Sequence, residues 1–100
     1  MAERYQLVLQ FALAPRDVAR FDRITEFENR LERHCQHPVG EAEGVYTLEG
    51  SDCKLGHMEV RLLTDDPPRT LEVIRDIIPP ACPYDAGYRN AHTQEPLNSL

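Results

Sequence analysis

The sequence predicts one α+β domain with the element order β-α-β-β-α-β, and three observations predict it. Apolar and polar residues alternate from residue 5 to residue 12, the period of a half-buried strand. Apolar residues then recur at helical spacing from about residue 17 to residue 35. Two further strand-like segments precede a second helix with clear start signals. A chain of 100 residues is large enough for one core between a sheet and a helical layer.

The first strand and the first helix have the clearest patterns. The alternation in the strand leaves Gln6, Val8 and Gln10 on one face. Pro15 ends this segment, and the helix should stop before Pro38. The expected apolar residues are Tyr5, Leu7, Leu9 and Phe11 in the strand, then Val18, Phe21, Ile24, Phe27 and Leu31 in the helix.

The second half of the chain supplies the other elements. Strands are expected around 44–49 and 57–63, joined through 50–56, whose flanking glycines permit a hairpin. Asp66 is suited to cap a second helix that begins at Pro67 and ends before Pro79. A weaker alternation at 84–89 predicts a short last strand. We expect Leu7 and Leu9 to share one core with Met58, Val60, Leu62 and Ile74.

The last eleven residues have no apolar rhythm. The predicted organisation is therefore a single domain over residues 1–89, followed by a flexible C-terminal tail over residues 90–100.

This order of elements resembles the ferredoxin-like superfold over residues 5–89. The resemblance implies an antiparallel sheet of strand order 4-1-3-2 with both helices on one face, an α+β sandwich. The segments YQLVLQF near the start and TDDP before the second helix are also similar to small uncharacterised bacterial proteins of this type. Neither resemblance implies an activity, because this superfold hosts many functions.

Charge and composition disfavour nucleic-acid and membrane partners. The net charge of −6 opposes binding to phosphate backbones. RNA-recognition motifs share the element order but stack bases on aromatic residues of the central strands. The corresponding outward positions here hold no aromatic residue. No apolar run reaches the roughly 18 residues of a membrane span, and the expected location is the cytoplasm.

Histidines and cysteines gather in two places without forming a metal-binding motif. Their spacings do not match those of zinc sites, which use about four nitrogen or sulfur ligands. We therefore expect no metal and no cofactor. The residues concerned are His34, Cys35, His37, Cys53 and His57.

Glu28 is a carboxylate inside the apolar stripe of the first helix. In one interpretation it leans to the edge of the helix and reaches water, since carboxylates are rarely buried without a partner. In the other it lines a polar pocket between the helix and the hairpin, together with Asp52 or Tyr46.

The outward face of the sheet offers the candidate binding residues Gln6, Gln10, Glu59 and Arg61. It is either a solvated face with cross-strand charge pairs or a face that binds a ligand or a second copy. Val8 is the one clearly apolar residue in its middle, so we expect a monomer or a weak dimer.

These observations favour a small cytoplasmic binding or interaction module without catalytic activity, and its acidity suits a basic protein partner. The alternative hypothesis is a small enzyme with an acid-base pocket. In that case Glu28 or Asp52 would act as the base and His57 as the acid.

Overall fold

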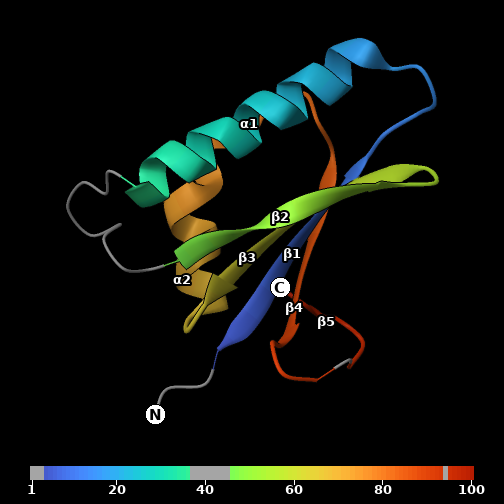
Figure 1. The fold of residues 1–100 in the computed structure, drawn as a ribbon. Helices are drawn as coiled ribbons and strands as arrows, with labels where there is room; N and C mark the ends of the chain where they lie inside the picture. The colour runs from blue at the N-terminus through green and yellow to red at the C-terminus, as the bar shows by residue number, and fades with distance from the viewer. Residues whose placement is uncertain (1–3, 37–45, 94) are drawn as a thin grey trace.

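The computed structural model of the protein describes residues 4–36, 46–93 and 95–100, and the predicted α+β class is confirmed (Figure 1). Neither helix in these ranges is long and apolar enough to cross a membrane. The elements are β1 (Tyr5–Ala12), α1 (Val18–Gln36), β2 (Tyr46–Lys54), β3 (His57–Thr64), α2 (Pro67–Ile74), the 3-10 turn η2 (Arg75–Ile77), β4 (Tyr84–Asn90) and β5 (Asn98–Ser99).

The strands form one antiparallel sheet of order β2-β3-β1-β4-β5. The central strand β1 pairs with β3 and with β4, so that Leu9 lies between Val60 and Ala86. Because directly opposed residues point to the same face, this register gathers the apolar side chains of the three strands on one side.

The core lies between that side of the sheet and the helices. Leu7 and Leu9 are fully buried in one cluster with Met58, Val60 and Leu62, so the predicted strand register is confirmed. The cluster also includes residues of both helices, and Phe11 meets Phe27 edge to face with ring centroids 5.7 Å apart. The helical residues in this core are Ile24, Phe27 and Leu31 of α1 and Ile74 of α2.

Both helices begin at side-chain caps. Asp17 accepts a hydrogen bond from the backbone N–H of Arg20 at 3.1 Å. The predicted cap Asp66 accepts one from Arg69 N–H at 3.3 Å, with Pro67 at the start of α2 as expected. These bonds satisfy donors that the first turn of a helix leaves unpaired.

The hairpin between β2 and β3 differs from the prediction. Residues 50–56 were expected to connect the strands, but β2 runs on to Lys54 and only Leu55 and Gly56 form the turn. Gly56 has φ of 83°, a conformation that glycine adopts without a steric penalty. The pairing of β2 with β3 shifts by one residue between Leu48 and Gly50, which is a β-bulge.

The segment expected as a loose tail contains a strand. Ser99 of β5 lies opposite Gly87 of β4, and the N–H of Leu100 donates to the carbonyl of Ala86 at 3.2 Å. Leu97 lies over Gly87 on the outward face, where a Cβ added to the glycine would meet Leu97 Cβ at 3.0 Å. Gly87 lacks a side chain and so admits Leu97.

Candidate functional site

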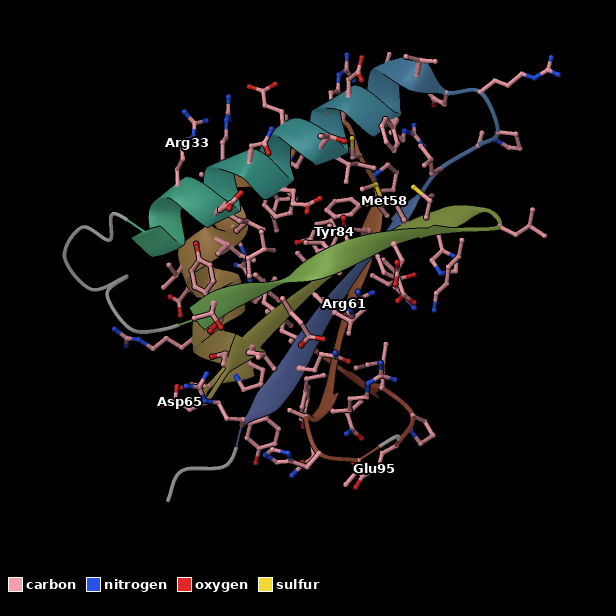
Figure 2. All side chains as sticks on the ribbon, viewed as in Figure 1. Arg33, Met58, Arg61, Asp65, Tyr84 and Glu95 are labelled. Atoms are coloured by element: carbon pink, nitrogen blue, oxygen red, sulfur yellow. The ribbon has the colours of Figure 1, made fainter. Side chains whose placement is uncertain are left out.

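Polar side chains cover the face of the sheet that the helices leave open. They come from four strands, because the antiparallel register alternates inward apolar residues with outward polar ones. Figure 2 shows Arg61 on the side of the sheet away from α1. All four binding candidates from the sequence belong to this surface. We call it the polar face, and it consists of Gln6, Gln10, Glu49, Asp52, Lys54, His57, Glu59, Arg61 and Arg89.

Glu59 is the buried carboxylate of the polar face. Its Oε1 accepts a hydrogen bond from Gln10 Nε2 at 3.3 Å and lies 3.3 Å from Lys54 Nζ. His57 Nε2 is 3.5 Å away and forms an ion pair when the imidazole is protonated. Burial raises the pKa of Glu59, but the hydrogen bonds and the charge of Lys54 outweigh it, so this pKa lies below its ordinary value of 4.5. Glu59 is therefore a fixed negative charge at neutral pH.

Arg61 connects three carboxylates across β2 and β3. Its Nη1 donates to Asp52 Oδ2 at 2.7 Å and lies 3.8 Å from Glu59 Oε2. Its Nε lies 3.7 Å from Glu49 Oε1. Arg61 is opposite Val8 in the register, and Val8 is fully buried although it faces outward. The polar face thus has no exposed apolar centre at Val8.

Gln6 extends these contacts toward β4. Its Oε1 accepts from Arg89 Nε at 2.8 Å, and its Nε2 donates to Glu49 Oε1 at 2.9 Å. A connected series of polar contacts therefore runs from Arg89 through Gln6 and Glu49 to Arg61. Its charges are held on paired strands, which fixes their positions relative to one another.

The carboxylates at the β2 side of the polar face are more exposed than the cation between them. The side chains of Asp52 and Glu49 are 58% and 35% exposed, whereas that of Arg61 is 19% exposed. A molecule that approaches this side therefore meets negative charge first.

Glu28 lies on the opposite side of the sheet. It is half-buried, and its Oε2 accepts a hydrogen bond from Ser51 Oγ at 2.7 Å. Ser51 is opposite Val60 and faces the helices, while Asp52 is opposite Glu59 and faces outward. The structure therefore does not bring Glu28 together with Asp52 and His57, and the hairpin residue that meets Glu28 is one that the sequence had not indicated.

Cys53 and His57, two of the candidate metal ligands, lie on opposite faces of the hairpin. Cys53 is exposed and lies opposite Met58, while His57 lies on the outward face opposite Lys54. Within the described ranges, no group of three or more His, Cys, Asp or Glu side chains is placed to hold a metal ion. The side chains of His34 and Cys35, and all of His37, fall outside the described parts, so the expected lack of a metal stays a prediction.

A second candidate site, which the sequence did not indicate, lies where the loop after β1 meets the tip of the β2–β3 hairpin (Figure 1). The two segments are joined by a hydrogen bond from the N–H of Leu13 to the carbonyl of Gly56 at 3.1 Å. Between them is a groove of about 380 Å³ formed by 13–18, Phe21 and 54–56, which we call the end groove.

Three of the large apolar side chains that line the end groove reach the surface. Val18 is 66% exposed, Phe21 is 40% exposed and Leu55 is 96% exposed. Val18 and Phe21 were expected on the buried stripe of α1, but the core of this helix is formed by residues farther along it. The sequence does contain one signal for the end groove. Leu55 is an apolar residue in a turn, where Gly, Asn, Asp, Ser and Pro dominate.

Comparison with known proteins gives no relative: no protein-family model, no curated protein and no solved structure matches the chain.

Proposed function

We propose that the protein is a small binding module without catalytic activity, whose polar face recognises a basic protein partner. The observation that carries this proposal is the exposure of Asp52 and Glu49 beside the more buried Arg61. The net charge of −6 adds a long-range attraction for a cationic partner. Complementary charges of this kind increase the association rate and select the partner.

The placement and pairing of the acid-base candidates support binding over catalysis. Asp52 lies on the polar face with His57, but its Oδ2 accepts a hydrogen bond from Arg61 Nη1 at 2.7 Å. A general acid and a general base must both reach the same substrate, and Glu28 is on the other side of the sheet from His57. Glu59 is the carboxylate nearest to His57, and its lowered pKa keeps it ionised at neutral pH. A group that transfers protons efficiently has a pKa near the working pH instead.

The same face supports a monomer or a weak dimer. Stable homodimer interfaces are rich in apolar area, and the outward Val8 is covered. Two copies joined through this face would also place several buried or half-buried charges against each other, which costs desolvation.

Two finer assignments belong to the same proposal. The order β2-β3-β1-β4 supports the ferredoxin-like superfold, to which β5 is an addition at the edge of the sheet. A cytoplasmic location is supported by the cysteine count of three, an odd number without the repeating spacing of a disulfide framework.

The test is the affinity of the protein for a fluorescently labelled, arginine-rich peptide, measured by anisotropy. We expect the double substitution E49Q/D52N to weaken binding about tenfold, since it removes the two exposed carboxylates that flank Arg61. Binding should also weaken as salt is added.

The matched control is E72Q/D76N, which changes the net charge equally at exposed positions on α2 and η2. It should weaken binding far less than E49Q/D52N does. Equal losses for the two double variants would mean that net charge alone attracts the peptide, and the proposed role of the polar face would be wrong.

A further inference from the structure

We infer that the end groove is a separate ligand site, which takes a small amphipathic carboxylate. The hydrocarbon part would lie on Phe21, Val18 and Leu55, and the carboxylate would pair with Arg16 at the rim. This site lies beyond the proposed role of the polar face and can be tested without it.

The apolar residues of the end groove favour a ligand with a hydrocarbon part. The free energy of the system falls when apolar surface leaves water. Leu55, Phe21 and Val18 therefore provide a favourable surface for a hydrocarbon chain. They lie on two different segments, the hairpin tip and the first turns of α1, and they converge on one concave space. Convergence of exposed apolar groups around a concavity is typical of binding sites.

The charged side chains at the rim favour an anionic ligand. Asp17, the carboxylate at the rim, caps α1, and its Oδ2 lies 3.7 Å from Arg20 Nε. Lys54 is shared with Glu59 of the polar face at 3.3 Å. Among the described residues Arg16 has no ion-pair partner, so it is the rim cation available to a carboxylate.

Arg16 also occupies an unusual backbone position. Its φ of 66° lies in the left-handed region, which residues with a Cβ rarely adopt. Glycine would fit this position more easily, yet the chain has a long cationic side chain there. Strained residues of this kind are concentrated at ligand sites.

The size of the groove favours a small molecule. Its volume of about 380 Å³ is at the lower end of the range of roughly 300 to 1,000 Å³ for small-molecule sites. An anionic membrane would be repelled by a protein with a net charge of −6. A peptide would need a longer contact surface than these two short segments provide.

The test is an NMR titration of the ¹⁵N-labelled full-length protein with octanoate, with octanamide as the uncharged analogue. Octanoate should shift the amides of 13–18 and 54–56, and octanamide should bind about tenfold more weakly because it cannot pair with Arg16. R16Q and L55S should each weaken octanoate binding about fivefold or more, whereas R16K should retain it. Leu55 is almost fully exposed, so L55S leaves the core intact.

The matched controls are R33Q, an equal loss of charge farther along α1, and L100S, an equal loss of an exposed leucine. Both should bind octanoate like the unmodified protein. The inference is overturned if octanoate does not shift the groove amides, if octanamide binds equally well, or if the controls weaken binding as much as R16Q and L55S. Binding to phosphatidylglycerol vesicles that is lost in R16Q and L55S, without octanoate binding, would assign the groove to a membrane surface instead.

Discussion

Single residues determine the polar contacts on both sides of the sheet. Glu28 could be placed on the apolar stripe of α1 from the sequence, since helical spacing alone fixes its direction. Its partner Ser51 could not, because that contact depends on how β2 pairs with β3. The sequence therefore indicates that Glu28 needs a partner, and only the fold supplies it.

The bond between Glu28 and Ser51 gives a prediction at this scale. Glu28→Gln should change the free energy of unfolding by less than about 0.5 kcal/mol, because the amide oxygen can still accept from Ser51 Oγ. Glu28→Ala should cost about 1 kcal/mol, since the hydrogen bond is lost. Urea unfolding measures both. If Glu28→Gln cost as much as Glu28→Ala, the charge itself would be what the fold requires.

The lowered pKa of Glu59 predicts a pH dependence of stability. An unfolded chain binds a proton at this group near pH 4.5, whereas the folded protein does so at lower pH. The stability that Glu59 contributes is therefore fully present above pH 4.5 and is lost as the pH falls through the lower folded pKa. We expect the difference in unfolding free energy between the unmodified protein and Glu59→Gln to shrink over that acidic window. A difference that is constant from pH 7 to pH 3 would contradict the lowered pKa.

At the scale of elements, the β-bulge in β2 decides which side chains share a face. Leu48 faces the core, and strict alternation from it would turn Asp52 toward the helices and Ser51 outward. The extra residue at Glu49–Gly50 reverses this, so that Ser51 meets Glu28 and Asp52 joins the polar face. The hypothesis of a pocket shared by Glu28 and Asp52 fails for this reason. A one-residue bulge has no strong signature in the sequence, although glycine in a strand is compatible with one.

The contact of β5 with β4 gives a prediction for an element. A Cβ at Gly87 would lie 3.0 Å from Leu97 Cβ and 3.1 Å from the carbonyl oxygen of Asn98, so these atoms must move. Because β5 has two residues, both exposed, and lies at the edge of the sheet, we expect it to move away at small cost. Gly87→Ala should therefore lower the free energy of unfolding by less than about 1 kcal/mol.

Hydrogen exchange distinguishes this outcome from a general loss of structure. In Gly87→Ala the amide of Leu100, which donates to Ala86, should exchange faster. The amides of β1 and β3 should keep their protection, because their pairing does not involve β5. Unchanged exchange at Leu100 would show that Gly87 tolerates a side chain and that Leu97 does not require the space.

For the whole molecule, the arrangement of the sheet and its core follows from patterns of period 2 and period 3.6. These patterns place Leu7, Leu9 and their partners correctly, because one-sided burial leaves a strand little freedom of register. The end groove does not follow from them. It is formed by a loop and a hairpin tip that are distant in the sequence and meet only through the order of the strands.

The most direct measurement of the central claim is a map of amide chemical shifts on addition of the arginine-rich peptide, with octanoate already present at saturation. A binding module that uses the polar face should show its largest changes at Glu49, Asp52, Glu59 and Arg61, and octanoate should not reduce them. Changes spread over α1 and α2, or changes at 13–18 and 54–56 that octanoate abolishes, would contradict the claim that the polar face is the surface that recognises the partner.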